Sequence, residues 1–228
     1  MKRDERERRR RTRLRRARLR SAVIIISVVA LLSGAIAIYR SQVFDIRDVE
    51  VLGTDHVSVE SVVTRAEVPH GATLLRYPSD AIKERVTVDP WIADATITRD
   101  FPHTLRIRVE ERVARAIVDT GAGALVVDGH GFVIAEHAVE ETTTLPVVRD
   151  TPGLDLKVGR KSTSEVLANA LAVIGGMGAE LAGRVASLSA RSIDETMLIT
   201  ADKIEILIGP ATEMEKKRLI VEQILRDQ

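Results

Sequence analysis

A stretch of nineteen uncharged residues near the N-terminus limits what this chain can fold into more than any other feature. It runs from Ser21 to Tyr39 (SAVIIISVVALLSGAIAIY) and is bounded by Arg20 and Arg40. At about 1.5 Å per residue, a helix of this length matches the hydrocarbon core of a bilayer. Ten of the nineteen residues are Val, Ile or Leu, which favour insertion. The sequence therefore predicts a transmembrane helix over 21–39, whose membrane-anchoring side chains include Val23, Ile26, Val29, Leu32 and Ile36.

The distribution of basic residues predicts the direction of this helix. The first 20 residues hold twelve Lys and Arg against three Asp and Glu, whereas only Arg40 and Arg47 follow within a comparable distance. Because the net charge of the whole chain is +1, a tail of +9 precedes a body of −8. Basic residues flanking a membrane helix are retained on the cytoplasmic side. We therefore expect a cytoplasmic N-terminus and an extracytoplasmic body.

Two alternative interpretations of this region stay open at this point. Ala35-Ile36-Ala37 resembles a signal-peptidase site, so cleavage would release a secreted domain with a hydrolytic or ligand-binding role. The apolar stretch is longer than the usual h-region of about 7 to 15 residues, which favours an uncleaved anchor. The Arg-rich tail could also bind nucleic acid. Membrane topology and anionic lipid headgroups already explain such a cluster, so no nucleic-acid partner is expected.

Hydrophobic periodicity divides the body into two parts. The first part predicts the order strand, helix, helix, strand, strand, with Ser58 and Ser79 as helix caps. Its elements are expected at 44–52, 58–66, 79–86, 93–99 and 105–110. A three-stranded sheet with two helices on one face is a complete two-layer domain.

The second part, from residue 113 onward, is rich in short strands. A capping box at Ser162-Thr163-Ser164-Glu165 predicts the first of two helices. Strands are expected at 116–119, 124–127, 132–135, 185–189, 196–200 and 203–208, with an edge strand at 145–148, and helices over 162–174 and 213–226. The fold class is therefore α+β, with a transmembrane helix, a βααββ domain and a second, β-rich domain with two helices.

The sequence contains no pattern of side chains that is typical of catalysis. The chain has no Cys, which excludes disulfides, thiol catalysis and Cys-ligated zinc. The five histidines lie in or near predicted turns, and no two are four residues apart, as a helical metal site requires. We therefore predict no catalytic, cofactor-binding or metal-binding residues, no cofactor, and no enzymatic activity.

Several motifs together resemble the FtsQ/DivIB family of bacterial cell-division proteins. Val51-Leu52-Gly53 is followed by the pattern PWI…A.I.R.FP..L.I.V.ER, which begins at Pro90 and ends at Arg112. The segment MLITADKIEILIG, over 197–209, is similar to part of the second domain of that family. The resemblance implies that residues 44–112 form a POTRA-type domain. It also implies that residues 113–228 form the second domain, which we expect to lack its last strand or strands.

The resemblance further implies a non-enzymatic scaffold of the division machinery, anchored by a single membrane span with residues 1–20 in the cytoplasm. Its expected partners are FtsB/DivIC-like and FtsL-like division proteins at the septum, where it would help to regulate septal cell-wall synthesis. Self-association stays an open question. An exposed sheet edge can recruit a partner strand, which makes the strands at 93–99 and 203–208 the candidate docking edges.

The candidate partner-binding residues follow from these two edges. They are Ile97, Arg99, Phe101, Lys203, Glu205 and Ile206. For Arg99 a second interpretation is open, in which its stem covers the core rim and its guanidinium pairs with Glu111.

Overall fold

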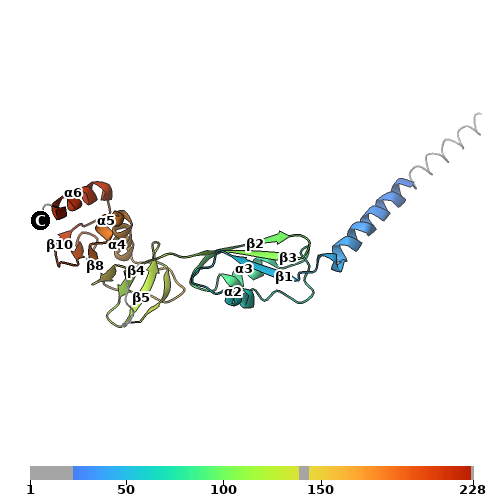
Figure 1. The fold of residues 1–228 in the computed structure, drawn as a ribbon, viewed down its shortest axis with the longest axis horizontal. Helices are drawn as coiled ribbons and strands as arrows, with labels where there is room; N and C mark the ends of the chain where they lie inside the picture. Colours follow the sequence, from blue (N-terminus) through green and yellow to red (C-terminus); the bar gives the residue numbers. More distant parts are fainter. Residues whose placement is uncertain (1–22, 139–143, 227–228) are drawn as a thin grey trace, which may run out of the picture. The chain divides into compact units, whose positions relative to one another are not determined.

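The computed structural model describes residues 23–138 and 144–226 (Figure 1). The described residues form two compact units. The first unit contains the chain up to Val49 together with Val68–Tyr77 and Arg99–Leu105, and the second contains the remainder. The predicted cytoplasmic tail and the first two residues of the predicted transmembrane helix lie outside the described residues.

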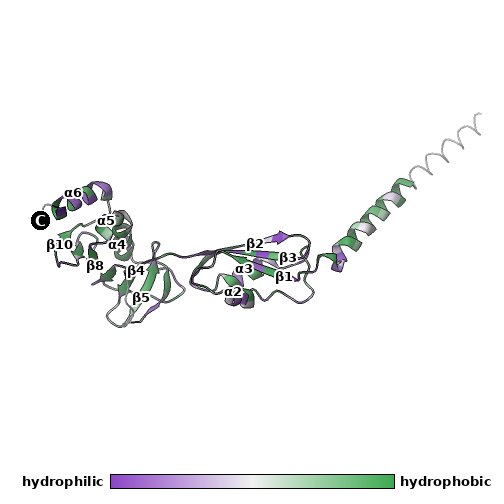
Figure 2. Ribbon diagram, in the orientation of Figure 1, coloured by the Kyte–Doolittle hydropathy of each residue, from purple (hydrophilic) through white to green (hydrophobic). Residues whose placement is uncertain are grey.

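The N-terminal helix, Val23–Arg40, is long and apolar enough to cross a membrane. Its apolar side chains are exposed along its whole length, including those of the five predicted anchor residues. Figure 2 shows the hydrophobic colour along this helix. An exposed helix that is apolar on all sides is stable in lipid and not in water, because water would have to solvate every apolar side chain.

Residues 44–112 contain the predicted order of elements. After a short 3-10 helix, η1 (Gln42–Phe44), come β1 (Asp48–Leu52), α2 (Val59–Ala66), α3 (Ser79–Val86), β2 (Ile92–Asp100) and β3 (Thr104–Glu111). The strand order is β1-β3-β2, so β1 and β2 lie at the edges. Ser58 caps α2 by accepting a hydrogen bond from the Ser61 N–H at 3.2 Å.

Two details of this domain differ from the sequence expectation. The first strand begins at Asp48, and not at Phe44, because residues 44–46 bond to a different segment. The Leu74 N–H donates to the Phe44 carbonyl at 2.8 Å, and the Ile46 N–H donates to the Ala72 carbonyl at 3.1 Å. Ser79 is the first residue of α3, and the N-cap position belongs to Pro78, which offers no side-chain hydrogen bond.

The buried side chains of this domain come from the two helices, from β2 and β3, and from the segment between the helices. Those that are fully or almost fully buried are Val62, Ala66, Leu74, Ile82, Val86, Ile92, Ala95, Leu105, Ile107 and Val109. Gly53 follows β1 with φ of +85°, and a Cβ atom there would collide with the Val109 carbonyl oxygen. Only glycine fits both the left-handed conformation and this close approach.

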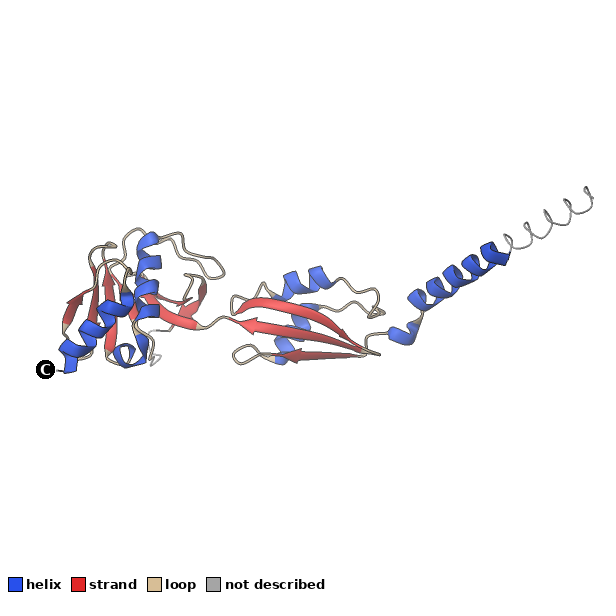
Figure 3. Ribbon diagram, turned by 90° about the horizontal axis from the view of Figure 1, so that it is seen from above, coloured by secondary structure: helices blue, strands red, loops and turns tan. Residues whose placement is uncertain are grey.

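The second domain is built on a seven-stranded sheet (Figure 3). Its elements are β4 (Ala114–Asp119), β5 (Ala124–Asp128), β6 (Val133–His137), β7 (Val147–Arg149), α4 (Glu165–Gly176), α5 (Gly178–Ala182), β8 (Val185–Ala190), β9 (Thr196–Thr200), β10 (Glu205–Leu207) and α6 (Met214–Arg226). The strand order is β10-β9-β8-β7-β4-β5-β6, which leaves β10 and β6 at the edges.

The prediction of an edge strand at 145–148 was wrong. β7 lies inside the sheet and pairs in parallel with β4 on one side and β8 on the other. Pro146 suggested an edge because proline donates no hydrogen bond. It immediately precedes the strand, however, and its carbonyl accepts the Ile117 N–H at 3.1 Å, so the missing donor breaks no ladder bond within β7.

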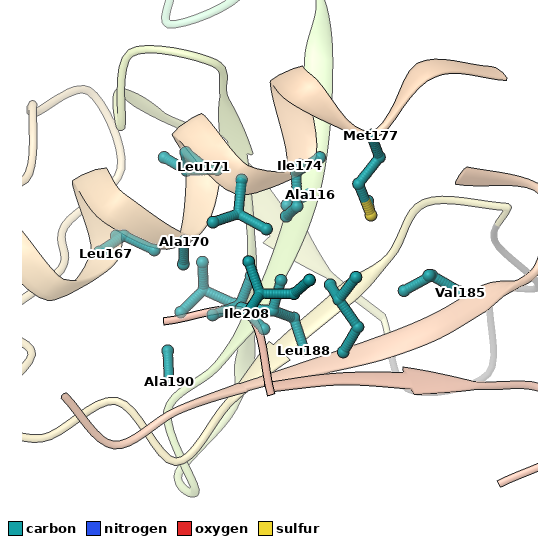
Figure 4. Packing of buried hydrophobic residues seen from close by; sticks show 14 of the residues in the cluster. Ala116, Leu167, Ala170, Leu171, Ile174, Met177, Val185, Leu188, Ala190 and Ile208 are labelled. Carbon is teal, nitrogen blue, oxygen red and sulfur yellow. The ribbon is translucent and has the colours of Figure 1, made fainter. Parts of the chain in front are cut away.

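The helices of the second domain also differ in detail from the expectation. Ser164, and not Ser162, is the N-cap of α4, and its hydroxyl accepts from the Leu167 N–H at 3.2 Å. The five-residue helix α5 was not predicted, because its glycines suggested only a helix end. Buried apolar side chains of α4 pack over the sheet in one cluster, which includes Ile174 of α4 and Leu188 of β8 (Figure 4).

Candidate docking edges of the two sheets

β10 is one of the two edge strands of the seven-stranded sheet. It pairs with β9 in the antiparallel sense, with Ile206 opposite Leu198. The Ile204 carbonyl accepts from the Thr200 N–H, and the Ile208 N–H donates to the Thr196 carbonyl, at 3.0 and 2.9 Å. Since the hydrogen bonds of a strand alternate in direction, the N–H groups of Glu205 and Leu207 point away from β9. Among the described residues, no strand takes up these two donors.

A shallow groove of about 490 Å³ lies on the sheet face beside this edge. Its apolar lining consists of Met197, Ile199 and Leu207. Its polar lining consists of Asp150, Ser189, Arg191, Glu195 and Glu205. Leu207 is 66% exposed beside the other apolar residues of this groove. An open edge next to a partly apolar groove offers both backbone donors and a side-chain pocket to a partner strand.

The three candidates predicted near β10 take different positions. Glu205 is exposed and lines the groove, whereas Ile206 is half-buried and packs against the domain core. Lys203 is exposed in the turn before β10, with φ of +64°. The structure thus brings Glu205 to the open face and directs Ile206 to the opposite one. Leu207 was missed, although strict alternation from Ile206 would have placed it on the same face as Glu205.

β2 is the corresponding edge of the three-stranded sheet, and polar groups dominate it. Thr96 and Thr98 are exposed, and Ile97 between them is half-buried. Asp94 accepts from the Lys83 ammonium at 2.6 Å. This hydrogen bond, with a further one from the Ala95 backbone, lowers the pKa of Asp94 below its usual value. Asp94 therefore stays ionised and keeps a negative charge on this edge strand.

The two candidates at the end of β2 contact aromatic rings. The Arg99 guanidinium lies 5.3 Å from the centroid of the Tyr77 ring, within the range of a cation–π interaction. Phe101 is 54% exposed and meets Phe44 edge to face, with ring centroids 5.5 Å apart. The alternative pairing of Arg99 with Glu111 is wrong, because Glu111 binds a different part of the domain.

Glu111, the last residue of β3, binds the turn before α2. Its side chain is 9% exposed, and its two oxygens accept from the backbone N–H groups of Asp55, His56 and Val57, each at 2.9 Å. Burial acts to raise the pKa of this carboxyl, but these hydrogen bonds act in the opposite direction and leave the pKa below its usual value. The carboxylate therefore fastens β3 to the start of α2 as an anion.

Arg112 follows directly and makes contacts of its own. Its backbone N–H donates to the Trp91 carbonyl at 2.7 Å. Its guanidinium donates to Asp128 at 3.0 Å and lies 3.7 Å from the centroid of the Phe132 ring. The Trp91 ring in turn stacks on His56, with centroids 4.4 Å apart. The Glu111-Arg112 pair is thus explained by structure, with each residue bound to different partners.

Groupings typical of metal sites do not occur in the part of the chain that the structure describes. No three or more His, Cys, Asp or Glu side chains gather there in a way that could hold a metal ion. The edge strands β2 and β10 contain the residues that the sequence predicted for partner binding.

Comparison with known proteins decides the family. Residues 44–112 match the family model of the FtsQ-type POTRA domain. This chain is a POTRA-domain protein of the FtsQ/DivIB family. The family recognised from the sequence is therefore confirmed. The α+β fold class and the apolar N-terminal helix are confirmed as well.

The similarity extends beyond the POTRA domain. The cell division protein FtsQ of Mycolicibacterium smegmatis is 30% identical over 176 residues, which cover 77% of this chain and 52% of that protein. The FtsQ proteins of Anaeromyxobacter sp. (strain K) and of Mycobacterium tuberculosis (strain H37Rv) are 28% and 27% identical over 82% and 86% of this chain. These matches cover 64% and 59% of the two relatives, so the chain spans about half to two thirds of their length. The comparisons favour a membrane protein of cell division over a released, secreted domain.

Proposed function

We propose that this chain is a non-enzymatic docking protein of the bacterial division machinery. In this proposal residues 1–20 lie in the cytoplasm, and the POTRA domain over 44–112 and the domain over 113–228 lie outside it. These outer domains bind other single-pass division proteins, of the FtsB/DivIC and FtsL kinds, at the septum. Through these contacts the protein helps to regulate septal cell-wall synthesis.

The open edge at β10 carries this proposal. It combines two outward N–H groups, on Glu205 and Leu207, with a neighbouring groove that has three apolar lining residues. A partner strand that pairs with β10 would satisfy those donors and cover Leu207 at the same time. The excess of Lys and Arg before the membrane helix supports the proposed orientation. The name of the relatives, cell division protein FtsQ, supports the process.

The β2 edge is kept as a second docking candidate, with Ile97 as its half-buried apolar residue. Its exposed threonines make docking at β2 less favourable than docking at β10, because polar side chains on an edge strand disfavour pairing with a strand of another chain.

Photocrosslinking in dividing cells tests the proposal. A photoreactive amino acid replaces Leu207 in the full chain, and Ala122, in the exposed loop between β4 and β5, is replaced in the matched control. We expect Leu207 to give a crosslinked product that contains another single-pass division protein, and Ala122 to give none. Identical products at both positions, or products that contain only unrelated proteins, would contradict docking at β10.

A further inference from the structure

The aromatic residues of this chain concentrate beside the membrane helix. The chain has six aromatic residues. Four of them lie in the compact unit that contains the N-terminal helix, although this unit is the smaller of the two: Tyr39, Phe44, Tyr77 and Phe101. None of the four is buried. Core packing therefore does not explain their number in this unit.

Direct contacts join these residues in three pairs. Besides the Phe44–Phe101 pair, the Arg76 guanidinium lies 5.7 Å from the centroid of the Tyr39 ring. Arg99 covers Tyr77 in the same way. We call this set, Tyr39, Phe44, Arg76, Tyr77, Arg99 and Phe101, the juxtamembrane aromatic surface. Each ring contacts either another ring of the set or one of its two arginines.

Backbone hydrogen bonds hold the segments of this surface together. The Leu74 and Phe44 bond ties residues 72–77 to the segment that follows the helix. The Arg47 N–H donates to the His103 carbonyl at 3.0 Å, which ties in the loop at 99–103. The His103 ring nitrogen Nδ1 lies 3.2 Å from the Asp45 carbonyl oxygen. The surface is thus fixed in the fold and does not depend on the side chains alone.

Chain connectivity places this surface close to the bilayer. Tyr39 is the second-last residue of the membrane helix, and Phe44 is five residues further along. At about 3.6 Å per residue at most, Phe44 lies within roughly 18 Å of Tyr39. Tyrosine rings, which are apolar on one side and polar on the other, concentrate at the headgroup level of membranes. Exposed phenylalanine rings can enter the boundary between headgroups and acyl chains. Arginine stems can lie along apolar material while the guanidinium reaches the headgroups.

We infer that the juxtamembrane aromatic surface rests in the headgroup layer of the bilayer that holds the helix. The occupant is lipid, because the surface is continuous with a membrane helix and combines exposed rings with basic groups. Four arginines lie in the described part of this unit (Arg40, Arg47, Arg76 and Arg99), against three aspartates (Asp45, Asp48 and Asp100). Since these charges nearly balance, ring insertion outweighs attraction to anionic lipid. The inference rests on the membrane helix alone and is independent of docking at β10.

Depth-dependent quenching of a single tryptophan tests this inference. In a Trp91→Phe background, Phe101→Trp places the probe on the surface, and Val88→Trp places it on an exposed position of the second unit. Both full chains are assembled into nanodiscs that contain lipids brominated near the headgroup. We expect the tryptophan at position 101 to be quenched at least threefold more strongly than the one at position 88. Zwitterionic nanodiscs should retain most of this difference, and anionic lipid should increase it.

Two results would overturn the inference. Equal quenching at the two positions, with equal access to aqueous acrylamide, would show that the surface faces water. The second result is protection of position 101 from acrylamide without quenching by bromine. If this protection increases with the number of chains per disc, the surface binds a second copy of the chain and not lipid. Thermal unfolding of both variants checks that the domain stays folded. Adding Arg99→Gln to the variant with tryptophan at position 101 should reduce the quenching and leave the unfolding transition unchanged.

Discussion

The edges of the two sheets are protected in different ways. β2 is nine residues long and presents exposed threonines, with Asp94 held by Lys83. β10 is only three residues long, but it ends at an exposed leucine beside a groove. Polar side chains protect the long edge strand β2 from pairing with other strands, whereas β10 is protected by its short length. A three-residue edge offers few backbone bonds by itself, so a partner at β10 must also use the groove.

The largest effect is expected when the outward backbone donor of β10 is removed. Glu205→Pro deletes the N–H that points away from β9 and sets a proline ring in the path of a partner strand. Partner capture by the full chain should weaken about a hundredfold, which corresponds to about 2.8 kcal/mol. Quantitative pull-down or interferometry with the crosslinked partner measures the change.

Glu205→Ala is the matched control for this change, because it removes the same side chain and keeps the N–H. Its affinity should stay within about twofold of the unsubstituted chain. If both variants bind equally well while remaining folded, pairing of backbone at β10 is wrong.

The next largest effect concerns the POTRA domain. Glu111→Gln leaves the three backbone N–H groups facing an amide that carries only one acceptor oxygen. Hydrogen bonds to charged groups contribute about 1.5 to 3 kcal/mol, so the free energy of unfolding of this domain should fall by about 2 kcal/mol. Chemical denaturation measures it, with the exposed Glu110→Gln as the control. Partner capture at β10 should not change, and a parallel loss of capture would mean that the β10 edge depends on the POTRA domain.

The side chain at the groove should contribute less than the backbone. Leu207→Lys places an ammonium where the proposed partner buries apolar surface, and we expect capture to weaken about tenfold, or about 1.4 kcal/mol. Thr96→Lys adds the same charge to the β2 edge and should leave capture unchanged. If Thr96→Lys weakens capture more than Leu207→Lys does, the partner docks at β2 and not at β10.

The smallest effect is expected on the stability of the POTRA domain when the pH is lowered. The pKa of Glu111 is lowered in the folded state, so its carboxylate stabilises the domain above the unfolded pKa of about 4.3, and this contribution is lost as the pH falls through the folded pKa. The stability of the unsubstituted chain should therefore decline below about pH 4.3 more steeply than that of Glu111→Gln. Parallel pH profiles of unfolding for the two proteins would show that Glu111 is not responsible.

Local patterns in the sequence predicted the elements well where the cause was local. The apolar stretch up to Tyr39, the helix at 79–86 and the order of elements along the first domain follow from periodicity and turn residues. Leu105, Ile107 and Val109 alternate with polar residues along the strand predicted at 105–110, and all three are buried. For these residues the local pattern and the tertiary environment agree.

The sequence failed where the cause lies far away along the chain. The position of β7 inside the sheet depends on parallel pairing with β4 and β8, which no local pattern encodes. Glu111 finds its partners 54 to 56 residues earlier, so its role could not be seen from its neighbours. The candidate site was predicted as an edge strand, and the structure adds which side of it is open. The docking role of Ile97, Arg99, Phe101, Lys203, Glu205 and Ile206 stays a prediction.

Amide hydrogen exchange at β10 tests docking by strand addition most directly. The full chain is compared with and without its bound division partner, and exchange is followed at the Glu205 and Leu207 amides. We predict that exchange of both amides slows at least tenfold in the complex, while the amide of Thr98, an exposed residue of β2, changes little. Unchanged exchange at Glu205 and Leu207 in a saturated complex would contradict the proposal that a partner strand pairs with β10.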